Sequence, residues 1–271
     1  MTMDLHQPKK AILIVSYGTN SLSTCDDFIL ALEKQLKSAL QDYAVYPAII
    51  SHGQDKDSTG LPFLFKVLEQ LYYNKITTLF ILPTFLLPGH SFLKMQQTLA
   101  DHQHLFNEIN IFTPLLAAKE YYGPISTSLA TLYPVHNDDE VIVFLGHGSS
   151  HSSSIYYNEL ETYFHNNHHI NYYVLTLDFL SDIGDFIAIL HKRGIKYIRL
   201  IPLLMLAGYH VFHDMAGKHQ ESLYSVLTAA GFKVDCVLSG LGNEPIIQQI
   251  LLDQLLIQIN NNNLLLYSPK Q

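Results

Sequence analysis

The sequence contains little cysteine and no long apolar segment. It has two cysteines among 271 residues, Cys25 and Cys236, which lie far apart and lack a CxxC spacing. This excludes a disulfide framework and a cysteine-held metal cluster. No apolar run reaches the roughly 18 residues that cross a bilayer, and the N-terminus lacks the apolar core of a signal peptide. We therefore expect a cytoplasmic protein with reduced cysteines and no membrane partner.

Positive charge is also scarce. The chain has 16 Lys+Arg against 24 Asp+Glu and a net charge of -8, so we do not expect a groove that follows the phosphates of a nucleic acid. It has no Walker loop, which argues against a nucleotide cofactor. An anionic substrate would have to be held locally, by N–H groups at loop-to-helix junctions.

Buried strands alternate with helices along the whole chain. The residues are 48% hydrophobic, and short apolar runs alternate with segments whose apolar residues recur at helical spacing. We expect strands at residues 11–15, 45–51, 76–82, 109–112, 140–145, 171–177, 195–204 and 233–238. We expect helices at residues 26–40, 61–72, 93–105, 119–132, 155–164, 183–192, 215–230 and 245–259. The alternation predicts an α/β protein with parallel sheets and right-handed crossovers.

The pattern is interrupted by a polar segment, YPVHNDD at residues 133–139, and then restarts. The run AILIVSYGT at residues 11–19 matches VIVFLGHGS at 141–149, and ITTLFILPTFLLPGHS at 76–91 matches IKYIRLIPLLMLAGYH at 195–210. We therefore expect an internal duplication: two similar doubly wound parallel-sheet domains, residues 1–132 and 133–271, around a cleft.

The duplication also predicts an asymmetric site. It sets Tyr17 opposite His147 and Ser91 opposite His210, so both prominent histidines fall in the second domain. We expect the C-terminal domain to carry the reactive groups and the N-terminal domain to supply mostly contact surface.

The stretch from Ile198 to Gly217 is central to the second domain. It begins as an apolar run typical of a strand buried on both faces. We place Pro202 at the end of that strand, because proline cannot donate a hydrogen bond to a ladder. His210 follows the strand, and a helix is expected to begin near Met215.

Three side chains that can bind metals follow strands of this domain. His147, Asp178 and His210 each lie at or just past the end of a predicted parallel strand, where the ligands of open α/β sheets gather. Two imidazoles and a carboxylate suit a borderline ion such as Co²⁺, Ni²⁺, Fe²⁺ or Zn²⁺, and three protein ligands leave coordination positions open. Taken alone, the same residues are equally compatible with structural histidines and a helix-capping aspartate.

Four segments, in order along the chain, resemble one enzyme family. They are VSYGTNS (15–21), LGHGSSHSSSIYYNEL (145–160), PLLMLAGYHVFHDMAG (202–217) and SGLGNEP (239–245). Together they resemble the anaerobic-type sirohydrochlorin cobaltochelatases, the class II chelatases of the CbiK type, over nearly the whole chain. The resemblance implies a two-domain chelatase fold around a tetrapyrrole cleft and ATP-independent insertion of a divalent metal into sirohydrochlorin. Co²⁺ is the implied metal, with Ni²⁺ and Fe²⁺ as alternatives.

The resemblance also assigns roles to residues. The family's metal-binding histidines fall on His147 and His210, and its intervening glutamate falls on Asp178, whose side chain is one methylene shorter. Tyr209 stands where an acidic residue is usual, and His213 where asparagine is usual. These departures leave the metal preference and the physiological substrate open.

We hypothesise that His210 accepts a pyrrole proton while His147 and Asp178 hold the incoming ion, because histidine acts both as a base and as a ligand near neutral pH. The two histidines could exchange these roles. Substrate contacts are expected from strand-end loops of both domains: Tyr17, Gly18, Thr19, Gly89, His90, Ser149 and Met205. The sequence does not decide between a monomer and a homo-oligomer.

Two other functions stay open at this stage. A non-catalytic carrier could bind a metal or a tetrapyrrole in the same cleft, and only turnover separates it from an enzyme. A hydrolase or phosphotransferase using His147 is less favoured, because the chain has no G-x-S-x-G elbow and no basic phosphate clamp.

Overall fold

The computed structural model describes residues 9–17, 22–50, 60–117, 119–148, 154–178 and 183–261. Three of the expected substrate contacts, Gly18, Thr19 and Ser149, lie outside the described residues.

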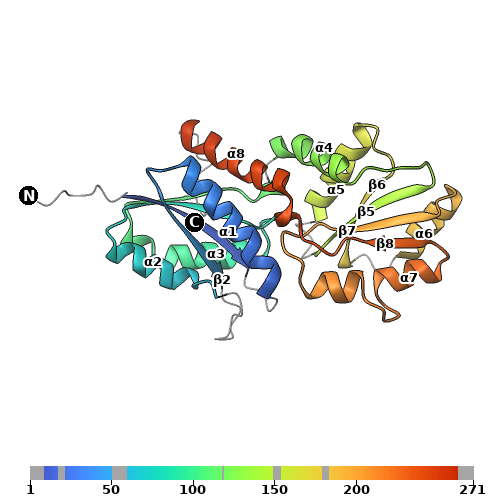
Figure 1. Cartoon of the computed structure of the whole chain (residues 1–271), viewed down its shortest axis with the longest axis horizontal. Coiled ribbons are helices and arrows are strands. Elements are labelled where there is room, and N and C mark those ends of the chain that lie inside the picture. The colour runs from blue at the N-terminus through green and yellow to red at the C-terminus, as the bar shows by residue number, and fades with distance from the viewer. Residues whose placement is uncertain are drawn as a thin grey trace, which may run out of the picture. The chain divides into compact units, whose positions relative to one another are not determined.

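The first four strands form one parallel sheet in the order β2-β1-β3-β4, of which β2 is labelled in Figure 1. The strands are β1 (Lys10–Tyr17), β2 (Ala44–Ile50), β3 (Thr78–Pro83) and β4 (Glu108–Ile111). The helices that follow them along the chain are α1 (Leu22–Ala39), α2 (Leu64–Tyr73) and α3 (His90–Asp101), with short 3-10 turns η1 (Gln103–Leu105), η2 (Leu115–Ala117) and η3 (Lys119–Tyr121).

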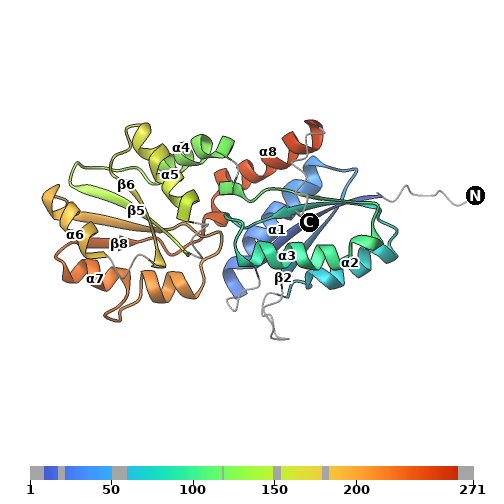
Figure 2. The same ribbon diagram turned by 180° about the vertical axis from the view of Figure 1, so that it is seen from behind.

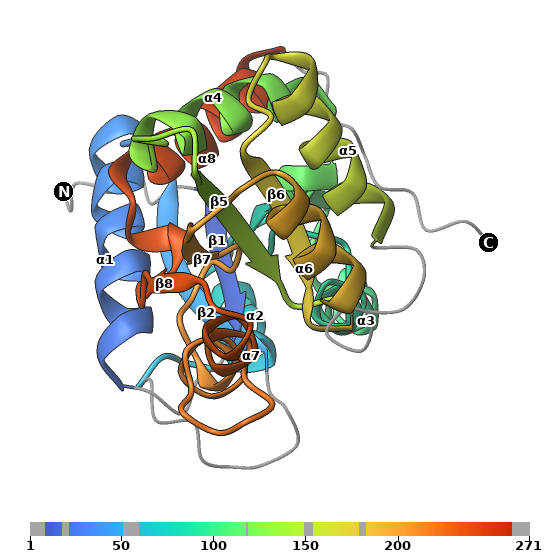
Figure 3. The same ribbon diagram turned by 90° about the vertical axis from the view of Figure 1, so that its right-hand side faces the viewer.

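Both faces of this sheet are buried. Ala11, Leu13 and Val15 of β1 pack into one cluster with apolar residues of α2 and α3. The residues between them, Ile12 and Ile14, point to the opposite face because side chains alternate along a strand, and they are also fully buried. Figure 3 shows α1 on the side of the sheet away from α3. Burial on both faces explains why β1 is an unbroken apolar run.

The last four strands form a second parallel sheet in the order β6-β5-β7-β8. The strands are β5 (Glu140–Gly146), β6 (Tyr172–Thr176), β7 (Tyr197–Pro202) and β8 (Lys233–Cys236). The remaining helices are α4 (Tyr122–Leu132), α5 (Ser154–Asn166), α6 (Ile183–Lys192), the π-helix η5 (Val211–Met215), α7 (Leu223–Ala229), the 3-10 turn η6 (Leu241–Asn243) and α8 (Pro245–Asn261).

The second sheet is also covered on both faces. Val141 and Val143 of β5 pack with α6 and α7, whereas Phe144 stacks on Phe164 of α5 with ring centroids 5.4 Å apart. Figure 2 shows α4 beside α5. The predicted fold class, two parallel-sheet α/β units, is confirmed.

The internal duplication is visible in the strand register. Val15 of β1 lies opposite Pro83 of β3, and Leu145 of β5 lies opposite Pro202 of β7. Proline is the last residue of its strand in both sheets. In the second sheet the residue after it adds one more hydrogen bond between the strands, because Leu203 N donates to Leu145 O at 2.8 Å. The expectation that Pro202 ends a buried strand is confirmed.

The division of the chain differs from the expected boundary at residue 133. One compact unit contains Met1–Ala117 together with Gln248–Gln271, and the other contains Ala118–Ile247. Helix α4, which precedes the polar segment at residues 133–139, therefore belongs to the second unit, and most of the last helix, α8, belongs to the first unit.

Packing contacts explain this exchange of helices. The ring of Tyr122, in α4, packs 5.4 Å from the ring of Tyr163 in α5. In α8, Gln254 Nε2 donates to the carbonyl of Thr113 at 2.9 Å. Sequence periodicity gives a helix and its apolar face, but not which sheet that face covers.

The prediction of one helix from Met215 to Ala230 is wrong for the first half of that range. The π-helix η5 ends at Met215, and α7 begins only at Leu223. The side chain of Ser222 caps α7, because its hydroxyl accepts a hydrogen bond from Ser225 N at 3.1 Å. The cap stabilises a new helix start there, so two short helices replace one long one.

Among the described residues, no helix has both the length and the apolar character that a membrane crossing requires.

Candidate functional site

The structure brings the two predicted histidines into direct contact. His147 follows β5 and His210 follows β7, and these two strands are hydrogen-bonded neighbours. Their Nε2 atoms lie 2.9 Å apart, and the rings meet edge to face with centroids 4.3 Å apart. Adjacent parallel strands thus place the two imidazoles at one end of the sheet, as expected for a ligand site of this fold.

The other ring nitrogens fix how these histidines are protonated. His147 Nδ1 lies 2.7 Å from the carbonyl oxygen of Gly148, and His210 Nδ1 lies 2.5 Å from a carboxylate oxygen of Asp214. A carbonyl and an ionised carboxylate can only accept, so both Nδ1 atoms must carry the proton.

As a result, in the neutral histidines both Nε2 atoms carry a lone pair, and the lone pairs face each other. At 2.9 Å this arrangement is favourable when one cation lies between them, either a shared proton or a metal ion. Metal-binding histidines commonly donate their second N–H to a carboxylate or a carbonyl, as both do here. Two nitrogens bound to one tetrahedral ion at about 2.1 Å would stand about 3.4 Å apart, which requires only a small separation of the rings.

Asp214 is ionised in this setting. Burial raises its pKa, but hydrogen bonds with His213 and His210 outweigh burial and hold the pKa of this carboxyl below its usual value. A carboxylate that accepts from His210 orients that ring and holds its proton on Nδ1.

Asp178, the third predicted ligand, lies beside the loop that follows His147. Gly148 has a positive φ of 71°, and a Cβ at this position would lie 2.5 Å from Asp178 Oδ2. The carboxylate therefore occupies space that only glycine leaves open. The ligand atoms of His147, Asp178 and His210 do not all lie within 4.8 Å of one another, so the structure brings the histidine pair together but not the full set of three.

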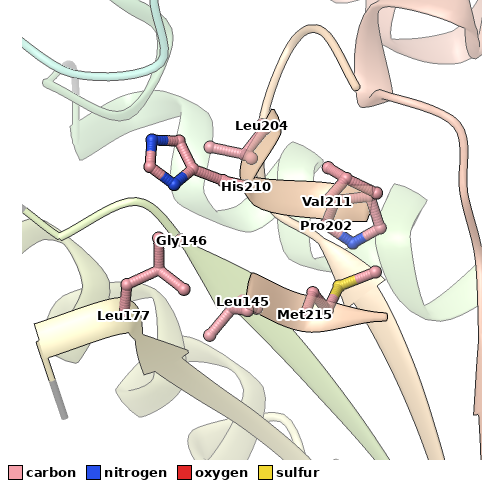
Figure 4. A pocket seen from close by; sticks show the side chains of 8 residues that line it. All are labelled: Leu145, Gly146, Leu177, Pro202, Leu204, His210, Val211 and Met215. Carbon is pink, nitrogen blue, oxygen red and sulfur yellow. The ribbon is translucent and has the colours of Figure 1, made fainter. Parts of the chain in front are cut away.

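An apolar hollow adjoins His210. Figure 4 shows its ring beside apolar side chains, with no other titratable group among them. The lining residues come from the ends of β5, β6 and β7 and from η5: Leu145, Gly146, Leu177, Pro202, Leu204, His210, Val211 and Met215. Met205, which we expected to contact substrate, is 6% exposed, and Met215 lines the hollow instead.

In the described part of the first unit, the positions that match His147 and His210 are Tyr17 and Ser91. Tyr17 ends β1 and is 42% exposed, with its ring 5.0 Å from that of Phe85. Ser91, the counterpart of His210, is buried. The two other expected contacts lie at the start of α3, where Gly89 is the N-cap and His90 is the first helical residue.

Sequence reasoning missed Asp214 and Met215 as site residues. Both follow His210 within η5. The spacing of His210 and Asp214, four residues apart, would have placed them on one helical face. The expected helix start near Met215 separates these two residues from His210 and obscures this signal.

Comparison with known proteins identifies relatives over almost the whole chain. The family model described as "Cobalt chelatase (CbiK)" matches residues 10–260. A sirohydrochlorin cobaltochelatase of Salmonella typhimurium is 27% identical over 252 residues, which is 91% of this chain and 95% of the relative. The sirohydrochlorin cobaltochelatase CbiKC of Nitratidesulfovibrio vulgaris is 25% identical over 261 residues, which is 93% of this chain and 91% of the relative.

A solved structure shares the fold. SirB from Bacillus subtilis with Fe³⁺ has a TM-score of 0.65 and 15% identity, covering 94% of this chain and 98% of that chain. At this identity the likeness establishes the two-unit architecture alone.

Proposed function

This chain belongs to the cobalt chelatase (CbiK) family, and from that premise we propose that it inserts Co²⁺ into the tetrapyrrole sirohydrochlorin without using a nucleotide. Two relatives named as sirohydrochlorin cobaltochelatases align with more than nine tenths of its length. The reaction class is therefore supported across both α/β units and not by one motif.

The observation that carries the chemistry is the pair of facing Nε2 lone pairs on His147 and His210. Insertion requires that two pyrrole N–H protons leave and that the ion loses water. A site that accepts either a proton or a metal ion serves both steps. Metal and proton compete for the same nitrogens, so the affinity for the ion falls as the pH is lowered.

We assign different roles to the two histidines. The His210 ring borders the apolar hollow, and Asp214 holds the ring proton on Nδ1, which leaves Nε2 as a lone pair. His210 is therefore the group that accepts a pyrrole proton. His147 is exposed, so it can receive a hydrated ion from solvent and hold it while water is exchanged, with Asp178 as the nearby carboxylate.

The surroundings of His210 suit a flat and largely apolar ring system. Apolar side chains such as Leu204 and Met215 line the hollow, and burying apolar surface contributes about 25 cal/mol per Å². This wall would orient one face of the macrocycle towards the proton acceptor, and the ion would approach on the side of His147.

An absorbance assay tests the proposal. Purified protein is mixed with sirohydrochlorin and Co²⁺, Ni²⁺ or Fe²⁺, and the spectral change on metal insertion is followed. We expect turnover with Co²⁺, loss of at least 100-fold in His147→Ala and His210→Ala, and a smaller loss in Asp178→Ala. Far-UV circular dichroism checks that each variant is folded.

Wild-type rates in either histidine variant would refute the assigned roles. If the wild-type protein binds one equivalent of tetrapyrrole or metal and never turns over, the protein is a carrier and not an enzyme.

A further inference from the structure

A second group of metal-binding side chains lies next to the histidine pair. His213, Asp214 and His219 each present one ligand atom, and these atoms lie within 4.8 Å of one another. We propose that they form a second site for a divalent metal ion, separate from the one between His147 and His210.

The fold builds this group from η5 and the turn that follows it. His219 Nε2 donates to the backbone carbonyl of His213 at 2.9 Å, and the two rings stack with centroids 4.2 Å apart. The turn is held by Ser222, which is fully buried and whose hydroxyl donates to the carbonyl of Gly217 at 2.6 Å. The two imidazoles are therefore placed side by side by backbone contacts.

The hydrogen bonds indicate which atoms a metal ion would bind. His213 Nδ1 donates to Asp214 Oδ1 at 2.8 Å, and a metal ion that replaces this proton would bind Nδ1 and Oδ1 as neighbouring ligands. His219 uses Nε2 for the carbonyl of His213, which leaves its Nδ1 free. Two imidazole nitrogens and a carboxylate oxygen are a ligand set for borderline ions such as Co²⁺ and Zn²⁺.

Exposure leaves room for water to complete the coordination. The side chain of His213 is 47% exposed and that of Asp214 is 26% exposed. Ligand atoms on one tetrahedral ion stand about 3.4 Å apart, and the present ligand atoms lie within 4.8 Å of one another, so these side chains need to shift by no more than about 1.4 Å. Such a shift is small for surface side chains.

Asp214 connects this group to the catalytic pair. One of its oxygens accepts from His210 and the other from His213. An ion on Nε2 of His210 and an ion on this carboxylate repel each other, so the second ion binds more weakly than the first. The proposal concerns binding of metal by the protein alone and does not depend on tetrapyrrole chemistry.

Equilibrium dialysis of the metal-free full chain against Co²⁺ alone tests the proposal. We expect two Co²⁺ per chain in the wild type, bound in two phases. His219→Gln keeps an N–H donor for the carbonyl of His213 but removes the ring nitrogen. We expect it to bind one Co²⁺ normally and the other at least about tenfold more weakly.

Two controls separate this site from other histidines. His104→Ala removes an exposed histidine of the first unit and should still bind two ions, whereas His147→Ala should lose the ion that His219→Gln keeps. Thermal unfolding verifies that the variants are folded.

One Co²⁺ per wild-type chain, or two that persist unchanged in His219→Gln, would overturn the proposal. Loss of an ion in His104→Ala would also overturn it, because binding would then be adventitious. A protein that fails to insert cobalt into sirohydrochlorin but binds two ions as described would refute the proposed function and leave the second site standing.

Discussion

At the scale of single residues, Asp214 determines what His210 can do. It accepts the Nδ1 proton of His210 and, through its other oxygen, the Nδ1 proton of His213. The free Nε2 of His210 therefore faces His147 as a lone pair. Without a charged acceptor, His210 could place its proton on Nε2 and would then be neither a base nor a ligand at that atom.

We predict that Asp214→Asn lowers the rate of cobalt insertion by about 10–100-fold and that the pH profile of the rate changes shape. The asparagine keeps the size of the side chain but loses the charged acceptor that holds the His210 proton on Nδ1. Steady-state rates between pH 5 and pH 9, compared with the wild type, measure the effect. An unchanged pH profile would mean that Asp214 is only a structural contact.

The same variant carries a stability prediction with a defined sign. Because the pKa of Asp214 is held below the 3.8 of an unperturbed aspartate, the folded state gains stability from its ionised form above that pH. This contribution is lost as the pH falls through the lower pKa of the folded protein. Denaturant unfolding of the wild type and Asp214→Asn should therefore differ most near neutral pH, and the difference should shrink below about pH 4.

At the scale of elements, the carboxyl end of β5 is shaped by two glycines. A Cβ on Gly146 would lie 2.4 Å from the ring of Tyr157 in α5, and a Cβ on Gly148 would meet Asp178. The positive φ of Gly148, 71°, is one that residues with a side chain rarely adopt. These glycines let α5 and Asp178 approach the end of the strand that carries His147.

We predict that Gly148→Ala destabilises the protein by about 2 kcal/mol and displaces Asp178. Unfolding by denaturant measures the first effect, and cobalt titration of the variant measures the second. Gly184→Ala is the matched control, because it lies in α6 with nothing within 4 Å of the new Cβ and should stabilise its helix by about 0.5–1 kcal/mol. Equal stabilities of the two variants would contradict the strain assigned to Gly148.

At the scale of the whole molecule, the last helix links the two units along the chain. α8 begins at Pro245, and the residues from Gln248 onward belong to the first unit. Gln248 accepts a side-chain hydrogen bond from Gln35 of α1 at 2.9 Å, and Leu255 is fully buried. The C-terminal part of the chain thus completes the core of the N-terminal sheet.

We predict that Leu255→Ala costs about 2–5 kcal/mol of stability and acts on the first unit. Amide hydrogen exchange should show faster exchange in β1 than in β5, although Leu255 is closer in sequence to β8. Ile257→Ala, at a position 51% exposed on the same helix, is the control and should change stability by less than about 0.5 kcal/mol. Equal loss of protection in β1 and β5 would indicate that the two units unfold together.

The sequence by itself determined the parallel strands, the duplication and the histidine pair. Apolar runs and helical spacing are local signals, and Pro83 and Pro202 mark equivalent strand ends in both sheets. The family resemblance added the prediction that His147 and His210 bind the metal, and the family match supports the reaction class.

Only the tertiary structure decided the geometry of the histidine pair and the grouping of the helices, because both depend on contacts between residues far apart in the chain. His147 and His210 are 63 residues apart, and no pattern along the sequence states which ring nitrogens face each other. The assignment of α8 to the first unit and the break between η5 and α7 likewise follow from packing and from the cap at Ser222. Periodicity specifies an apolar face, but the partner that buries this face is chosen by the fold as a whole.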